Sequence, residues 1–270
     1  YELSSGRALV AFLTCFAPIF LGFLLPGGQL VAWTAETAHK VVDYDFLVLA
    51  GNSIMLATVA ATVAVGAALL LAYGQRLKPG PVLGIAARVA SMGYAVPGAV
   101  IAVGVLLPFA WLDNQVDGLM RSTFGISTGL ILSGTLVALV FGYLVRFLAI
   151  SFNTVEASLG KVTPTMDGAA RTLGLGAGAT LRRVHVPIVS GSLLTAALLV
   201  FVDVMKELPA TLIMRPFNFN TLAVRAFELA EDEQLAESAP AALSIVGVGI
   251  VPVILLTFAI ARSRPGHWSD

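Results

Sequence analysis

The sequence predicts an all-α, polytopic membrane protein with about six transmembrane helices in a single transmembrane domain, residues 1–270. Hydrophobic residues make up 57% of the 270, charged residues only 12%, and the mean hydropathy is +0.89. Because soluble globular chains carry about 25% charged residues, this composition leaves too little polar surface for a soluble fold. Six apolar stretches each approach the ~20 residues that a helix needs to cross a bilayer. They lie near residues 9–25, 54–73, 89–112, 129–145, 188–205 and 241–261.

The third stretch contains a proline followed by a glycine, Pro97 and Gly98. Pro97 lacks a backbone N–H group, so it is expected to kink or break the helix at this point. Two interpretations of the glycines in this stretch stay open. Gly98 and Gly104 either permit close packing of neighbouring helices or form a hinge in a pore. Pro97 and Gly98 are therefore candidates for the lining or the gate of a translocation path.

The fifth stretch ends in charged residues followed by a proline. Asp203 and Lys206 can pair on one helical face, whereas Asp203 and Glu207 repel each other, so Lys206 is expected to lie between the two acids. Pro209 then breaks the helix and leaves irregular backbone, which a membrane tolerates only against protein or water. Charges at this depth are costly. They indicate either a structural ion pair at the helix end or the lining or outer gate of a path, and both can hold together.

A polar, basic and glycine-punctuated segment, residues 155–187, separates the fourth and fifth stretches. Within it a short helix is predicted over residues 164–173, with Thr163 as the N-cap and Gly174 just past the end. One face of this helix is apolar, at positions i, i+3, i+4 and i+7. The residues on that face are Met166, Ala169, Ala170 and Leu173. Asp167 and Arg171 share another face at the spacing of an opposite-charge pair. Such a helix is suited to docking in a partner's groove.

Lysine and arginine residues are distributed unevenly between the two sets of connecting segments. The set that contains residues 155–187 and both termini holds most of the 16 basic residues, including Arg146 and Arg264. Basic residues favour the cytoplasmic side, so this set and both termini are predicted to be cytoplasmic. Acidic residues gather on the opposite side, where a solvated loop is a commoner explanation than a cation site. They are Glu228, Glu231, Asp232, Glu233 and Glu237.

Several kinds of chemistry have no support in the sequence. The net charge is zero, so nothing favours nucleic-acid binding. The motifs GxxxxGK[ST] and HExxH are missing, which argues against ATP binding in a P-loop and against a metalloprotease site. Cys15 is the single cysteine, and His39, His185 and His267 are spread over different segments. We therefore expect no enzyme activity, cofactor or metal site, and we expect His185 to be an interfacial polar residue.

Segment 155–187 resembles the cytoplasmic EAA motif of permease subunits in binding-protein-dependent ABC importers. The motif consists of EAA, three residues, Gly, nine residues and I-x-L-P. Here Gly168, Ala169 and Ala170 occupy its first part, Gly174 follows after three residues, and Pro187 ends it at the matching distance. The position of the motif glutamate is Gly168, however, and the nearest acid is Asp167, one residue earlier.

Two further blocks resemble the ferric-iron branch of these permeases. Residues 206–212, KELPATL, and residues 215–223, RPFNFNTLA, look like the segment before the last span of that branch, and residues 94–98, YAVPG, also look like theirs. The resemblance covers about residues 52–261. Such iron permeases commonly consist of two fused halves of about six spans each. The chain begins with Tyr1, and we interpret it as the second half of a longer polypeptide or as a trimmed segment.

The resemblance implies a MetI-like ABC importer permease in the bacterial inner membrane that moves ferric iron into the cytoplasm by alternating access. Thiamine, phosphonate, polyamine or another small solute is the alternative cargo, and a non-transport membrane scaffold that binds an ATPase is the alternative role. The implied partners are cytoplasmic ABC ATPase subunits, a periplasmic substrate-binding protein and a second permease half. The helix 164–173 is then a coupling helix that docks in a groove of the ATPase. Its implied coupling residues are Met166, Asp167, Gly168, Ala169, Ala170, Arg171, Leu173, Gly174 and Pro187.

Overall fold

The computed structural model describes residues 4–263, and within them the chain forms helices and loops without any strand. Arg264, which contributes to the predicted topology, and His267 lie outside the described residues. Two short π-helical turns, η1 and η3, and one 3₁₀ turn, η2, connect longer helices. In chain order the elements are α1 (Ser5–Ile19), η1 (Phe20–Leu24), α2 (Leu25–Val41), α3 (Tyr44–Leu77), α4 (Pro81–Ala90), η2 (Gly93–Ala95), α5 (Gly98–Phe124), α6 (Leu136–Leu159), α7 (Pro164–Thr172), α8 (Ala177–Thr180), η3 (Leu181–His185), α9 (Val186–Met205), α10 (Pro209–Met214), α11 (Leu222–Glu231) and α12 (Leu235–Ser263).

Six helical segments in the described part of the chain are long and apolar enough to cross a membrane, as the sequence predicts. They are Ser5–Val41, Tyr44–Leu77, Gly98–Phe124, Leu136–Leu159, Ala177–Met205 and Leu235–Ile254. Their boundaries differ from the prediction. The third span begins at Gly98 rather than residue 89, because the helix ends before Pro97 and restarts after it. The fourth begins at Leu136 rather than residue 129, because Gly129 and Gly134 adopt positive φ angles in the preceding loop.

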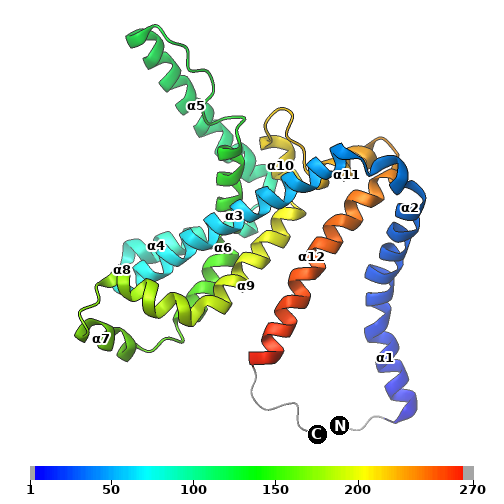
Figure 1. Ribbon diagram of the computed structural model, residues 1–270, viewed down its shortest axis with the longest axis horizontal. Coiled ribbons are helices and arrows are strands. Elements are labelled where there is room, and N and C mark those ends of the chain that lie inside the picture. The colour runs from blue at the N-terminus through cyan, green and yellow to red at the C-terminus, as the bar shows by residue number, and fades with distance from the viewer. Residues whose placement is uncertain (1–3, 264–270) are drawn as a thin grey trace.

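The centre of the molecule is a bundle of α3, α6 and α9, each packed against the other two (Figure 1). Its core contains a row of alanines on α3, buried against larger side chains of α6 such as Leu139, Tyr143 and Phe147. Small residues let helices approach closely where lipid removes the hydrophobic drive for association. The alanines of this row are Ala57, Ala60, Ala61 and Ala64.

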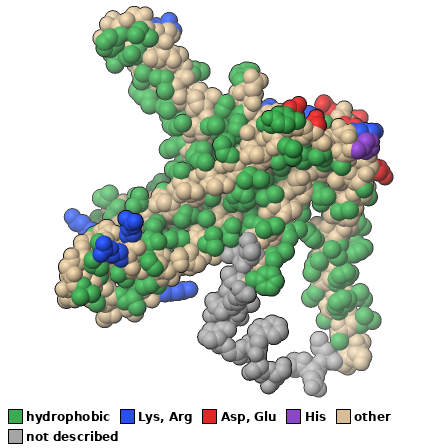
Figure 2. All heavy atoms as spheres, viewed as in Figure 1, with side chains coloured by type: hydrophobic (Ala, Val, Ile, Leu, Met, Phe, Trp, Pro, Cys, Tyr) green, Lys and Arg blue, Asp and Glu red, His purple; other side chains and the backbone are tan. Residues whose placement is uncertain are grey.

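The remaining helices flank this bundle (Figure 1). α2 packs on α12, and α11 packs on α12 and α3, so these helices form a second layer beside the bundle. α5 contacts α6 and α10 and projects away from the bundle, while α1 buries none of its residues. The apolar side chains of α1 and α5 lie open over much of the surface in Figure 2. Large apolar surfaces of this kind are covered by lipid or by another subunit in a membrane protein.

Charged side chains gather at two separate ends of the molecule (Figure 2). Blue Lys and Arg side chains stand out at the end that carries α7 and α8, whereas the red acidic side chains lie at the end with α2 and α11. This separation matches the two sets of loops that the sequence distinguishes. The assignment of the α7 end to the cytoplasm stays a prediction from the positive-inside rule.

Candidate functional site

The predicted short helix is present as α7, and its two ends are built from local signals. Pro164 is the first helical residue, and Thr163 precedes it with extended backbone angles of φ −69° and ψ 146°. The side chain of Thr163 bonds the Thr165 hydroxyl rather than a backbone N–H, so the expected side-chain cap is not formed. At the other end, Gly174 has φ +78° and its N–H donates to the Arg171 carbonyl, while the Leu175 N–H donates to Ala170. These two bonds form a Schellman motif.

The predicted apolar face of α7 is partly exposed at the protein surface and partly buried within the chain. Met166 is 43% exposed and Leu173 is 80% exposed, and Ala169 is also exposed. Ala170 is only 3% exposed, because the turn through Gly174 folds α8 back against α7. Ala170 therefore packs inside the chain, and the prediction that it contributes to an outward docking face is wrong. Met166 and Leu173 are available to a partner.

Asp167 is directed into the protein rather than toward the rim of α7. Its Oδ2 accepts hydrogen bonds from Arg76 Nε at 3.0 Å and from Arg76 Nη2 at 2.7 Å, and its Oδ1 lies 2.6 Å from His185 Nε2. The expected pair with Arg171 is not formed, and Arg171 is exposed. An acid one residue earlier than the motif position therefore occupies a different face, since successive helical residues are rotated by about 100°.

Arg76 and His185 are themselves fixed by the helices around them. Arg76 lies in the last turn of α3, and its Nη1 and Nη2 also donate to the carbonyls of Leu159 and Val162, at 2.8 and 2.7 Å. His185 has no exposed surface, so the prediction that it is interfacial is wrong. Its ring lies 5.3 Å from the ring of Tyr73. We call Tyr73, Arg76, Asp167 and His185 the coupling-end cluster.

The charge state of Asp167 follows from these contacts. Burial favours the neutral acid, but the hydrogen bonds from Arg76 and His185 outweigh it and hold the pKa of Asp167 below its usual value. A carboxylate can only accept hydrogen bonds, so the proton in the short contact belongs to His185 Nε2. The other ring nitrogen, Nδ1, is buried and has no hydrogen-bond partner within residues 4–263.

A second group of charges lies where two helices are interrupted. Arg146 is in the middle of α6, not in a cytoplasmic loop as predicted, because α6 continues to Leu159. Its Nε lies 3.3 Å from Oε2 of Glu207, which follows α9 and is 6% exposed. The other carboxylate oxygen of Glu207 accepts a hydrogen bond from the backbone N–H of Ala210. A buried ion pair therefore joins α6 to the break between α9 and α10.

The predicted charges at the end of the fifth span are separated into two pairs. Lys206 Nζ lies 2.8 Å from Asp203 Oδ1, which confirms this predicted pair. The hydrogen bond to Asp203 raises the pKa of Lys206, and the partial burial of its amine opposes the change. Lys206 forms no ion pair with Glu207 within the described residues, and Glu207 uses Arg146 instead. The interruption also begins before Pro209, which is the first residue of α10.

Gly98 brings the other interrupted helix to the same place. A Cβ atom at Gly98 would collide with Arg146 Nη1, and it would lie 2.5 Å from Glu207 Oε1. The start of α5 after Pro97 therefore packs directly on the ion pair. Arg146 Nε is near Glu207 but is not aligned for a hydrogen bond, and neither Nε nor Nη1 has a hydrogen-bond partner in the described part of the chain. We call Gly98, Arg146 and Glu207 the helix-break cluster.

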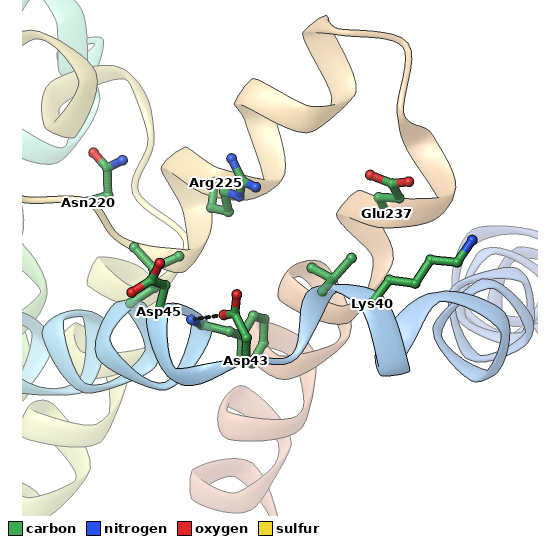
Figure 3. A pocket seen from close by; sticks show the side chains of 9 residues that line it. Lys40, Asp43, Asp45, Asn220, Arg225 and Glu237 are labelled. Atoms are coloured by element: carbon green, nitrogen blue, oxygen red, sulfur yellow. Dashed lines mark hydrogen bonds between the residues drawn. The ribbon is translucent and has the colours of Figure 1, made fainter.

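A hollow lies near the junction of α2 and α3 (Figure 3), at the end of the molecule away from α7 in Figure 1. It is bounded by the α2–α3 turn, the segment before α11, and the start of α12, and it presents charges of both signs. Its polar residues are Lys40, Asp43, Asp45, Asn220, Arg225 and Glu237. Within residues 4–263, no three His, Cys, Asp or Glu side chains are arranged to hold a metal ion.

The chain is similar in sequence to several transport permeases. No known protein-family profile matches it. It is 27% identical over 259 residues to an Fe(3+)-transport system permease protein (FbpB 2) of Haemophilus influenzae, covering 94% of this chain and 48% of the relative. It is 28% identical over 246 residues to a probable molybdenum ABC transporter permease protein of Haloferax volcanii, covering 88% and 85%. A putative 2-aminoethylphosphonate transport system permease protein (PhnV) of Salmonella typhimurium is 26% identical over 173 residues, covering 64% and 58%.

The fold is matched by solved structures as well. A chain of a bacterial alginate ABC transporter, in complex with an alginate pentasaccharide-bound periplasmic protein, superposes with a TM-score of 0.68 at 12% identity and covers 95% of this chain and 94% of its own. The chain described here is therefore a multi-pass, all-α membrane protein with the fold of an ABC importer permease. It spans about half the length of the iron and phosphonate relatives.

Proposed function

We propose that the chain is one permease half of a binding-protein-dependent, ATP-driven importer that moves a small solute into the cytoplasm by alternating access. The observation that carries this proposal is α7, a short helix with Met166 and Leu173 exposed at the basic end of a six-span permease fold. An exposed apolar helix face at a membrane surface needs a partner groove. The EAA spacing from Gly168 to Pro187 supports ABC ATPase subunits as that partner.

A second permease half, fused or separate, completes the proposed transporter. The iron relative is about twice as long as this chain, since the match covers 48% of it. α5 projects from the bundle and carries exposed apolar side chains. These side chains suit contact with a second permease half or with lipid. At the opposite end from α7, the hollow around Asp45, Arg225 and Glu237 offers a charged surface to a periplasmic binding protein (Figure 3).

The path for the solute is proposed to pass the helix-break cluster. Interrupted helices with buried charges occur in membranes where backbone and side chains face protein or water rather than lipid. Arg146 and Glu207 lie where the two interruptions meet, beside Pro97, Gly98 and Pro209. The pair of exposed Lys206 and half-buried Asp203 precedes the interruption and is proposed to line the same region. In this proposal both interpretations of these charges apply: they line the path, and their ion pairs also fix the ends of the helices.

Ferric iron is the cargo that we propose first, because the iron relative matches 94% of this chain and the KELPATL block resembles that branch. Molybdate and phosphonate are the competing cargoes suggested by the other relatives. The path needs no tight iron site, since a deep binding well would slow release.

Uptake measurements test the proposed function. Cells that carry the complete transporter should accumulate radiolabelled ferric iron, molybdate or 2-aminoethylphosphonate, and uptake should stop when the ATPase is inactivated. Removing residues 164–173 should abolish uptake while the spans still insert. ATPase binding without flux of any solute would instead establish the alternative, a membrane scaffold, and would overturn the transport proposal.

A further inference from the structure

The attachment of α7 to the rest of the chain depends on few contacts. Two segments without regular structure, residues 160–163 and 173–176, connect it to α6 and α8. Ala170 is the one residue of α7 that is buried, and burying a single methyl group stabilises by only about 1 kcal/mol. Backbone connections and apolar packing would therefore leave α7 free to tilt. The hydrogen bonds of Asp167 are its main additional attachment.

Those hydrogen bonds reach all three helices of the central bundle. Arg76, in the last turn of α3, holds Asp167 with two donors and the C-terminal carbonyl of α6 at Leu159 with a third. His185, which holds the other carboxylate oxygen, is the residue directly before α9. One carboxylate on α7 is thus joined to the ends of α3, α6 and α9. Charge-assisted bonds of this kind are about twice as strong as neutral ones.

The same helices lead to the helix-break cluster. On α6, Arg146 and Leu159 are separated by about 20 Å of continuous helix. α9 begins at Val186 beside His185 and ends just before Glu207. A displacement of the α6 and α9 ends at the coupling-end cluster therefore reaches both members of the Arg146–Glu207 ion pair.

We propose that Asp167 is a positioning residue that joins α7 rigidly to α3, α6 and α9, so that movement of α7 changes the separation of Arg146 and Glu207. This inference rests on the proposed function, because it requires an ATPase that moves α7. The acid of this loop acts within the permease, and the outward face of α7 contacts the ATPase through Met166 and Leu173 without an acidic group. We call these hydrogen bonds of Asp167 the joint. Without the joint, α7 moves with the ATPase and the bundle of α3, α6 and α9 does not.

Gly168 supplies a matched control for this idea. It is exposed, and a Cβ atom placed on it meets no atom within 4 Å. Gly168→Glu therefore adds an acid to the outward face next to Asp167 without disturbing the joint. The comparison separates an acid that acts inside the permease from one that acts on the ATPase.

The test uses the complete transporter in proteoliposomes, with uptake and ATP hydrolysis measured in the same preparation. The cargo is whichever of ferric iron, molybdate or 2-aminoethylphosphonate the wild type transports. Asp167→Asn should retain ATP hydrolysis and lose about tenfold in solute moved per ATP, as expected for a lost charge-assisted bond. Asp167→Glu should recover part of that ratio, whereas Gly168→Glu added to Asp167→Asn should not recover it, because an acid on the outward face cannot bond Arg76 and His185. A wild-type ratio in Asp167→Asn overturns the joint.

A covalent replacement covers the case in which Asp167→Asn fails to assemble. In a Cys15→Ser background, Asp167→Cys combined with Arg76→Cys should transport poorly until a short thiol crosslinker bridges the two positions, and then regain solute moved per ATP. Failure of the crosslink to restore the ratio overturns the proposal. Absence of ATP-driven uptake in the wild type would instead contradict the proposed function itself, so the two failures are distinguishable.

Discussion

The coupling-end cluster and the helix-break cluster are both arginine–carboxylate pairs between helices, and they differ in how completely they are bonded. Arg76 makes four hydrogen bonds, two to Asp167 and two to backbone carbonyls. Arg146 lies 3.3 Å from Glu207, and its buried Nε and Nη1 lack hydrogen-bond partners in the described part of the chain. A buried pair stabilises only when its remaining donors are satisfied. The first pair is therefore built to persist, whereas the second has fewer bonds that hold it together.

The glycines beside the two clusters differ in how much space surrounds them. Gly98 leaves room that Arg146 and Glu207 occupy, whereas Gly168 faces open space next to Asp167. Close approach at the helix-break cluster depends on the absence of a side chain. At the coupling end the joint depends on charge and hydrogen bonds. Steric substitutions should therefore affect the first cluster, and charge substitutions the second.

The largest expected effect on stability separates the two arginines. Arg76→Gln combined with Asp167→Asn removes four hydrogen bonds, two of them to backbone carbonyls, so the free energy of unfolding should fall by about 3 kcal/mol. Arg146→Gln combined with Glu207→Gln removes a poorly bonded pair and leaves no unpaired buried charge, so it should destabilise by about 1 kcal/mol. Thermal unfolding of the purified protein in detergent measures both. Equal losses of unfolding free energy in the two variants would contradict the distinction between a firmly bonded coupling-end cluster and a weakly bonded helix-break cluster.

The next effect concerns the packing of α5 on the ion pair. Gly98→Ala forces Arg146 and Glu207 to move, and overpacking of this kind costs about 1–3 kcal/mol, so uptake should fall about tenfold or more. Gly104→Ala is the matched control, because a Cβ atom there meets nothing within 4 Å. Uptake assays on both variants also decide between packing and hinge roles for these glycines. A loss confined to Gly104→Ala would favour the hinge.

Most of the fold could be predicted from the sequence because hydropathy acts over whole helices. The six spans, the break at Pro97 and the ends of α7 at Pro164 and Gly174 all follow from local signals. Span boundaries were less accurate. Polar residues inside a span look like its end, and Arg146 was therefore assigned to a loop although apolar residues continue on both sides of it. An arginine inside such a run is itself a signal of function.

The partners within each cluster could not be predicted, because they come from segments far apart in the sequence. Nothing near Arg76 indicates that it meets Asp167, which is 91 residues away. The i, i+4 rule instead favoured Arg171, since local spacing is the only geometry that a sequence shows directly. The pairing of Asp203 with Lys206, which is local, was predicted correctly.

A smaller effect is expected at the surface of α7. Leu173→Ala removes an 80% exposed side chain that the proposal buries in the ATPase, so affinity should fall by about 1–2 kcal/mol, roughly tenfold, with no change in permease stability. Titration of the purified ATPase against the permease in nanodiscs measures this. The comparison variant is Leu175→Ala, because Leu175 is partly buried and lies outside α7. Unchanged affinity in Leu173→Ala would contradict the docking face.

The smallest effect appears only in acid and depends on the direction of the Asp167 pKa. Its hydrogen bonds with Arg76 and His185 hold the folded-state pKa below the value of about 3.9 that a free aspartate has, so ionised Asp167 stabilises the fold at all pH values above that. This contribution is lost as the pH falls through the lowered pKa. The difference in unfolding temperature between wild type and Asp167→Asn should therefore stay constant from pH 7 to about 5 and shrink below about 4. A difference that vanished near neutral pH would mean that Asp167 is neutral in the folded protein, and the coupling-end joint would then lack the charge on which it depends.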